Sequence, residues 1–144
     1  MIKLERCALS DADDIHALEI EYMSRPWSLE NIVSAIKSEN TAMFKATEDN
    51  RLVGFGGVDI VVGAEASITD VVVALGYRKK GVASAILSAI IAECRKKHAE
   101  TVWLEVWEGN LPAVALYEKF GFTTGYRRKN YYPEGDAIVM TLKP

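Results

Sequence analysis

The chain has 144 residues, a formal net charge of −3 and 49% hydrophobic residues. This composition excludes intrinsic disorder and predicts a single domain over residues 1–144 that buries its own core. Nucleic acid is not expected as a partner, because proteins that neutralise phosphates usually carry a basic excess. No apolar run reaches the roughly 20 residues of a membrane span, and the first residues lack the apolar stretch of a signal peptide. We therefore expect a cytoplasmic protein with no membrane partner.

A metal cofactor is not expected either. The two cysteines, Cys7 and Cys94, lie far apart in the sequence and do not have the spacing of a zinc site. We expect each of them to be a buried thiol, which is the usual state of a free cysteine. His16 and His98 fall within helix-like stretches, and the pattern around them suggests no chemistry.

The first 40 residues predict a strand followed by two helices. Residues 2–8 alternate loosely and indicate a strand. Ser10 is the expected N-cap of the first helix, which should end before Pro26 because the residue preceding a proline disfavours helical geometry. Ser28 is the expected N-cap of a second helix.

Two strands are expected next, at residues 41–48 and 51–62. Asp49-Asn50 between them is typical of a two-residue hairpin turn. Three glycines in the second strand predict a bulge or a close approach of another backbone. These are Gly54, Gly56 and Gly57.

A strand, helix and strand follow at residues 66–74, 81–98 and 101–107. The first strand ends in a run of valines that is typical of a strand buried on both faces. Because the connecting helix is long, the two strands should be parallel and joined by a right-handed crossover.

The C-terminal part predicts a helix and two antiparallel strands. Leu111-Pro112 suits the first turn of a helix and Gly121 suits its end. Residues 122–131 and 136–142 are the expected strands. The predicted fold class is therefore α/β, with one mixed, mostly antiparallel sheet and helices on both faces, in the order β-α-α-β-β-β-α-β-α-β-β.

The segment from Arg78 to Ser84 precedes the long helix and is a candidate anion site. Backbone N–H groups at a helix N-terminus bind anions. Lys79 and Lys80 are unfavourable at that end of the helix dipole unless an anion is bound there. Gly81 lets the backbone approach such a ligand. The alternative is a solvated basic turn, and the segment matches neither a Walker loop nor the dinucleotide motif.

The motif Arg78-x-x-Gly81-x-Ala83, placed after a valine-rich strand, resembles the signature of the GNAT superfamily of N-acetyltransferases. Further segments resemble the C-terminal motif of that superfamily, in the same order and at similar distances. They are Leu104-Glu105-Val106, Asn110, Ala113, Leu116-Tyr117-Glu118-Lys119 and Phe120-Gly121-Phe122. The resemblance covers nearly the whole chain, and the fold of the superfamily matches the predicted order of elements.

One branch of the superfamily, the RimI-type protein N-terminal acetyltransferases, is similar in two further segments. Residues 127–132, followed by 136–140, resemble its C-terminal hairpin, and Arg25-Pro26-Trp27-Ser28 resembles its Pro-Trp-Ser loop. The strand that carries Glu105 departs from the pattern, because Trp107 stands where the branch usually has arginine.

The resemblance implies acetyl-coenzyme A as the cosubstrate. It implies that the backbone of Val71, Val72 and Val73 pairs with the pantetheine arm, as an added strand would. The pyrophosphate would lie on the loop and helix start, and Asn110 would bond the cofactor near its thioester. The loop residues concerned are Arg78, Lys79, Lys80, Gly81, Val82, Ala83 and Ser84.

Two residues are implied to move protons. Glu105 matches the position of the general base, which takes a proton from the acceptor amine directly or through a water. Tyr117, which is 12 residues later, matches the acid that protonates the departing thiolate. Taken without the resemblance, the pattern favours a surface carboxylate on an alternating strand for Glu105 and a core aromatic at helical spacing for Tyr117.

The acceptor side is implied to include Trp27, Trp107, Tyr131 and Tyr132. The expected acceptor is the N-terminal α-amine of a protein or peptide, and the branch points to a ribosomal protein with an N-terminal alanine. An α-amine titrates near 8 and a lysine near 10.4, which makes the α-amine easier to deprotonate. Two alternatives stay open: an acetyltransferase of a small-molecule amine, and a non-catalytic module that binds acyl-coenzyme A.

Overall fold

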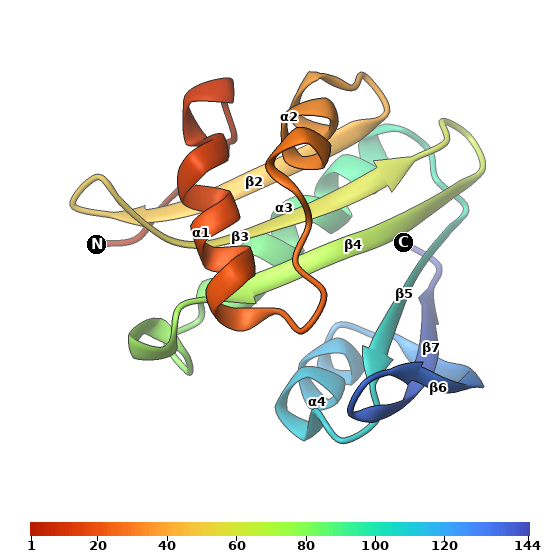
Figure 1. Cartoon of the computed structure of the whole chain (residues 1–144). Helices are drawn as coiled ribbons and strands as arrows, with labels where there is room; N and C mark the ends of the chain where they lie inside the picture. The colour runs from red at the N-terminus through yellow and green to blue at the C-terminus, as the bar shows by residue number, and fades with distance from the viewer.

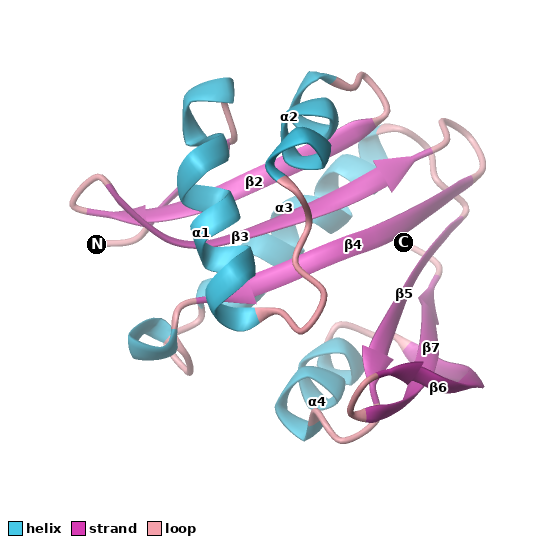
Figure 2. Cartoon of the chain, viewed as in Figure 1, coloured by secondary structure: helices cyan, strands magenta, loops and turns pink.

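Seven strands form one mixed sheet in the order β1-β2-β3-β4-β5-β7-β6, as the computed structural model shows for residues 1–144 (Figures 1 and 2). Every neighbouring pair is antiparallel except β4 and β5, which are parallel. The strands are β1 (Lys3–Arg6), β2 (Thr41–Glu48), β3 (Arg51–Ile60), β4 (Glu65–Val73), β5 (Thr101–Trp107), β6 (Thr123–Tyr132) and β7 (Gly135–Leu142). The predicted fold class is confirmed.

Four α-helices and two short 3-10 helices join the strands in the predicted order. They are η1 (Leu9–Asp11), α1 (Ala12–Tyr22), α2 (Leu29–Lys37), η2 (Leu75–Tyr77), α3 (Val82–Lys96) and α4 (Leu111–Lys119). In Figure 1, α1 and α2 lie in front of the sheet and α3 lies behind it. None of the helices is both long and apolar enough to cross a membrane.

The sheet separates two hydrophobic clusters. The larger one joins the inner face of α3 to the sheet and includes Tyr117 of α4, whereas the smaller one lies under α1 and α2. Gly56 allows α3 to pack closely on β3, because a Cβ there would lie 2.5 Å from Cγ2 of Ile86. The close approach predicted for the glycines of β3 is thus confirmed. A bulge in β4 also lies next to Gly57, where the register with β3 shifts.

The parallel strands β4 and β5 pair only at their beginnings. Glu65–Ser67 lie opposite Thr101–Trp103, and no pairing follows beyond Ser67. β4 continues to pair with β3, and β5 continues with β7, so the two strands diverge. The last part of β4 therefore keeps free backbone N–H and C=O groups on the side that faces the opening.

The valine run at the end of β4 differs from the prediction in one respect. Val72 is buried against the α1–α2 cluster, but Val71 and Val73 are only half-buried. The run was expected to be buried on both faces. One face instead borders the opening, because β5 has already diverged at this level.

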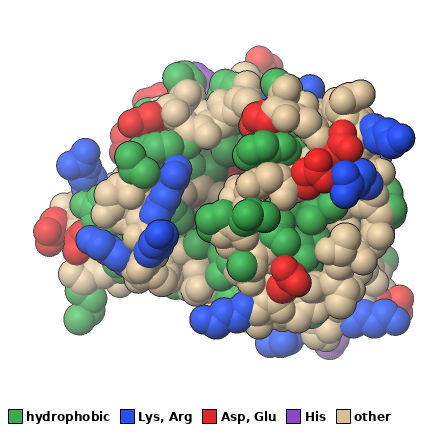
Figure 3. All heavy atoms as spheres, turned by 90° about the horizontal axis from the view of Figure 1, so that it is seen from below, with side chains coloured by type: hydrophobic (Ala, Val, Ile, Leu, Met, Phe, Trp, Pro, Cys, Tyr) green, Lys and Arg blue, Asp and Glu red, His purple; other side chains and the backbone are tan.

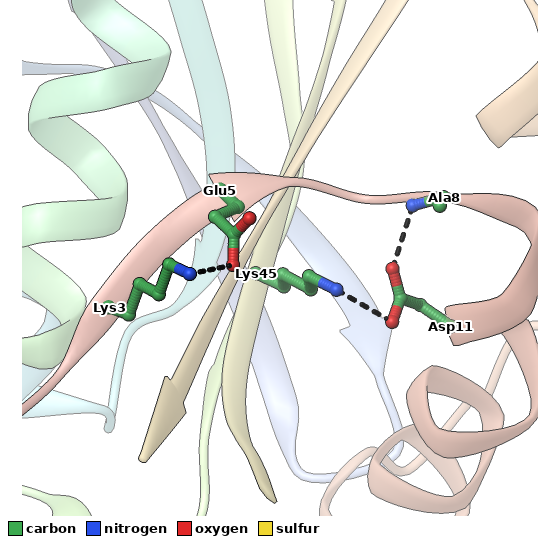
Figure 4. A network of polar contacts seen from close by, with 5 residues as sticks. All are labelled: Lys3, Glu5, Ala8, Asp11 and Lys45. Atoms are coloured by element: carbon green, nitrogen blue, oxygen red, sulfur yellow. Dashed lines mark hydrogen bonds and ion pairs between the residues drawn. The ribbon is translucent and has the colours of Figure 1, made fainter. Parts of the chain in front are cut away.

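The start of α1 also differs from the prediction. Ser10 lies inside η1 and does not cap α1, which begins at Ala12 after Asp11. The carboxylate of Asp11 accepts the N–H of Ala8 at 2.7 Å and pairs with Lys45 of β2 at 2.9 Å (Figure 4). Hydrogen bonds to Ala8 and Lys45 lower the pKa of Asp11, although its partial burial acts in the opposite direction. This network ties η1 to β2.

Two other local predictions are confirmed. Ser28 caps α2, since its Oγ accepts the N–H of Asn31 at 3.1 Å. Asp49 and Asn50 have φ angles of 51° and 64°, as a hairpin turn with both central residues in the left-handed region requires.

Candidate active site

The divergence of β4 from β5 opens a cleft of about 740 Å³. One wall is the end of β4, and the others are η2, the start of α3 and the start of α4. Seen from below, this part of the surface has a hollow with basic side chains on one rim and apolar side chains beside it (Figure 3). Most of the residues predicted to bind the cofactor line this cleft. They are Val71, Val72, Val73, Arg78, Lys79, Gly81, Val82, Ala83, Ser84 and Asn110.

The loop before α3 presents its backbone at one end of the cleft. Gly81 is the N-cap of α3 and has a φ of +81°, while Lys79 has a φ of +62°. No side chain caps this helix end, so its first N–H groups are available to a ligand. An anion there would find aligned N–H groups and the positive end of the helix dipole.

Two of the basic side chains in this loop already have partners. The Nε of Arg78 donates to the backbone oxygen of Val73 at 3.1 Å, and its guanidinium lies over the ring of Tyr22. The ammonium of Lys80 lies 5.6 Å from the centre of the Tyr77 ring, and Lys80 does not line the cleft. Of the predicted loop residues, only Lys80 thus points elsewhere.

A second cavity of about 220 Å³ adjoins the cleft on the side of β5. Tyr117, Asn110 and Val71 line both spaces, so the two meet at these residues. Four further residues predicted from the sequence lie at the smaller cavity. Glu105, Trp107 and Tyr132 line it, and Tyr131 bonds to Glu105.

Glu105 is held on both carboxylate oxygens. Its Oε1 accepts the hydroxyl of Tyr131 at 3.1 Å, and its Oε2 lies 2.6 Å from Nε of Arg128. The hydroxyl of Tyr132 donates to the backbone oxygen of Glu105 at 3.1 Å. β6 therefore folds over β5 and places a cation and two phenols around one carboxylate. Burial and the charge of Glu105 raise the pKa of both tyrosines.

Tyr117 is buried and lines both cavities. Its ring packs edge-to-face on Phe122, with the centroids 5.8 Å apart. Burial, together with the charge of Asp70, raises its pKa to about 12. The phenol therefore stays protonated near neutral pH and has a proton to donate at the junction of the two cavities.

Asn110 uses its side-chain oxygen to cap α4. Oδ1 accepts the N–H of Ala113 at 3.3 Å. The amide group of the side chain is left for a ligand, since Asn110 lines both cavities.

The two tryptophans of the predicted acceptor side differ in position. Trp107 lines the smaller cavity, and its indole covers Gly109 and Gly135, where a Cβ would collide with or closely approach ring atoms. Trp27 is half-buried and packs against the α1–α2 cluster. Its backbone N–H donates to Oε1 of Glu19 at 2.8 Å. Trp27 does not line either cavity.

Sequence reasoning missed three polar residues that the fold brings to the site. Arg128 lies in a segment that resembles the family, but only pairing of β6 with β7 reveals its contact with Glu105. Asp70 lines the smaller cavity, and Glu19 lies behind it on α1. Their contact joins segments 51 residues apart, and no local pattern signals it.

Comparison with known proteins identifies the class. A model of the acetyltransferase (GNAT) family matches residues 9–122. The chain is 35% identical over 121 residues to the ribosomal protein bS18-alanine N-acetyltransferase of Escherichia coli strain K12, an alignment that covers 81% of this chain and 80% of that protein. The chain therefore belongs to the GNAT family of acetyltransferases.

Solved structures agree with this assignment. The crystal structure of the ribosomal-protein-S18-alanine N-acetyltransferase from Escherichia coli has a TM-score of 0.90 at 31% identity, covering 99% of this chain and 94% of that one. Naa50 of Arabidopsis thaliana, solved with the bisubstrate analogue CoA-Ac-MVNAL, has a TM-score of 0.87 at 21% identity, covering 99% of each chain. The second likeness concerns the fold alone.

Proposed function

We propose that this protein transfers the acetyl group of acetyl-coenzyme A to the N-terminal α-amine of a protein. The observation that carries the proposal is the junction of two cavities at Tyr117. The larger cavity suits a long cofactor that ends at the junction. The smaller one admits an amine to the same point, next to Glu105.

The proposed cofactor position follows from the open edge of β4. The backbone groups of Val71–Val73 that face away from β3 pair with the amides of the pantetheine arm, in the way an added strand pairs with a sheet edge, except the oxygen of Val73, which accepts Nε of Arg78. The pyrophosphate lies on the N–H groups at the start of α3. A backbone N–H of the same β4 segment then stabilises the oxyanion of the transition state.

The chemistry is a direct transfer. Glu105 takes a proton from the acceptor ammonium, directly or through a water, and the free amine attacks the thioester carbon. The C–N bond forms as the C–S bond breaks, and Tyr117 gives its proton to the leaving sulfur. The second proton of the attacking nitrogen passes through water to the Tyr117 phenolate, and Glu105 releases its proton to solvent. The products are the N-acetylated acceptor and free coenzyme A, and both residues return to their starting protonation states.

A protein acceptor is supported by the aromatic walls of the smaller cavity and by the relatives. Tyr132 and Trp107 line it, and Tyr131 lies beside them on β6. The relative that is 35% identical is named for acetylating the alanine of ribosomal protein bS18. We infer an acceptor of the same class, a ribosomal protein with N-terminal alanine.

Release of coenzyme A thiol with paired peptides tests the proposal. One peptide has a free N-terminal alanine and no lysine, and its partner is N-terminally blocked and contains lysine. The expected result is turnover of the first peptide at least ten times faster than of the second. Binding of coenzyme A without turnover of any amine would instead indicate a non-catalytic module, and faster turnover of free amino acids or polyamines would indicate a small-molecule enzyme.

A further inference from the structure

Glu19 has a buried carboxylate oxygen without a donor. Its side chain is completely buried on α1. Oε1 accepts the N–H of Trp27 at 2.8 Å, which ties the Pro-Trp-Ser loop to α1. Oε2 is also buried, and no N–H or hydroxyl group donates to it. Because an unsatisfied buried carboxylate is costly, the missing donor calls for a specific partner.

The β-bulge in β4 directs Asp70 toward this oxygen. Gly57 of β3 lies opposite Asp70, and Val58 lies opposite Ile68, so Thr69 is the extra residue. Ile68, before the bulge, packs in the cluster on the α3 side of the sheet. Val72, after the bulge, packs in the cluster under α1, on the opposite side. An extra residue turns the following side chains to the other face. Asp70 therefore shares its face with Val72 and reaches α1, which crosses in front of β4 (Figure 1).

The two carboxyl groups contact one another without a cation. Asp70 and Glu19 are both buried, on facing elements, Glu19 raises the pKa of Asp70, and neither takes part in any ion pair of the chain. Burial, the hydrogen bond to Glu19 and its charge raise the pKa of Asp70 to about 9. Two carboxyl groups in such contact share one proton, since both cannot be ionised at low cost.

The pair lies at the proposed acceptor cavity. Asp70 lines it, and its charge contributes to the raised pKa of Tyr117. An anionic Asp70 would favour the unreactive ammonium form of an amine bound there. With the shared proton on Asp70, the remaining negative charge of the pair lies on Glu19, which does not line the cavity. The other titratable groups that line the cavity are Tyr22 on α1, Glu105 on β5, Tyr117 on α4, Tyr132 on β6 and Glu134 in the β6–β7 turn.

We propose that Asp70 donates a shared proton to Oε2 of Glu19 and is thereby a positioning residue for the acceptor. The bond connects the diverging end of β4 to Glu19, and Glu19 holds the backbone of Trp27. Loss of the proton in alkaline solution places two carboxylates in contact and loosens the loop. The inference rests on the proposed function, because the acceptor is what the loop and cavity receive.

Steady-state kinetics between pH 7 and 10.5 tests the proposal with two variants. Asn in Asp70→Asn donates an N–H to Glu19 but does not titrate, whereas Asp70→Ala removes the bond. For the wild type we expect the KM for an alanine-terminal peptide to rise at least threefold between pH 8 and 10, with the KM for acetyl-coenzyme A steady. Asp70→Ala should raise the peptide KM about tenfold at pH 8, and Asp70→Asn should restore much of this loss and flatten the alkaline rise. An alkaline rise in Asp70→Asn equal to that of the wild type would overturn the proposal.

Thermal unfolding provides a readout that needs no acceptor. The pKa of Asp70 is higher in the folded chain than its ordinary value of 3.8. Its contribution to stability is therefore complete below pH 4 and is lost as pH rises toward 9. The Tm of the wild type should fall between pH 6 and 9 by more than that of Asp70→Asn. Asp13→Asn, at an exposed site on α1, is the matched control and should follow the wild type. Equal pH dependence in all three would overturn the shared proton, whichever acceptor the enzyme uses.

Discussion

The Nε of Arg128 lies 2.6 Å from Oε2 of Glu105, and this ion pair joins β6 to the carboxylate proposed as the base. The arginine comes from the C-terminal hairpin and the glutamate from β5, so the hairpin is part of the site. Tyr131 binds the other oxygen of the same carboxylate from the same strand. The hairpin therefore fixes the orientation of Glu105 toward the acceptor cavity.

Arg128→Gln should lower turnover about tenfold, because a misplaced catalytic group loses much of the advantage of orientation. Arg127→Gln is the matched control. Arg127 is the neighbouring residue, but it pairs with Glu108 and Asp136 at the outer end of the hairpin. The measurement is kcat with a saturating alanine-terminal peptide. Equal losses in the two variants would show that the hairpin matters only as a folded unit.

Glu105→Gln should lower kcat about a hundredfold or more, the usual contribution of a general base. The loss should be largest at lower pH, where more of the acceptor amine arrives as ammonium and needs a base. The pH–rate profile of the variant should therefore follow the titration of the amine itself. A profile with the shape of the wild type would remove Glu105 from this role. Glu108→Gln, at an exposed carboxylate beyond the end of β5, serves as the control.

Tyr117→Phe should lower kcat about tenfold to a hundredfold, since the leaving thiolate loses its proton donor. Affinity for coenzyme A should stay within about twofold, because the ring remains packed on Phe122. Burial raises the pKa of Tyr117 to about 12, so titration of this phenol should not reduce the wild-type rate below about pH 11. Isothermal titration with coenzyme A and single-turnover rates separate the two effects, and an unchanged kcat would refute the acid assignment.

Gly81→Ala should weaken binding of acetyl-coenzyme A and lower stability by about 1 kcal/mol, the cost of a side chain in the left-handed region. The φ of Gly81 is +81°, and a Cβ there would meet nothing within 4 Å. Any loss thus comes from the backbone that presents the loop to the pyrophosphate. Gly76→Ala is the control, because its site is equally open and its φ is not positive. A KM for acetyl-coenzyme A that is the same in both variants would contradict the proposed pyrophosphate site.

The sequence predicted most of the fold because its signals are local. Ser28 as a cap, Asp49-Asn50 as a turn and the glycines of β3 each depend on neighbouring residues, and the structure confirms all three. Ser10 was assigned wrongly as the cap of α1, because the pattern does not distinguish a 3-10 turn from the start of an α-helix.

The candidate site was predictable only in part, for a physical reason. The cofactor loop is one continuous segment, so its residues could be named from the sequence. The contacts of Arg128 with Glu105 and of Asp70 with Glu19 depend on strand register and on a bulge. A shift of one residue in a strand turns every side chain to the other face, and alternation alone does not show where a bulge occurs.

Tandem mass spectrometry of one peptide tests the central claim most directly. The peptide carries both a free N-terminal alanine and an internal lysine, and it is incubated with the enzyme and acetyl-coenzyme A. We expect acetylation on the α-amine, with the lysine unmodified, and loss of that product in Glu105→Gln. Acetylation confined to the lysine, or an equal amount of product in the variant, would contradict it.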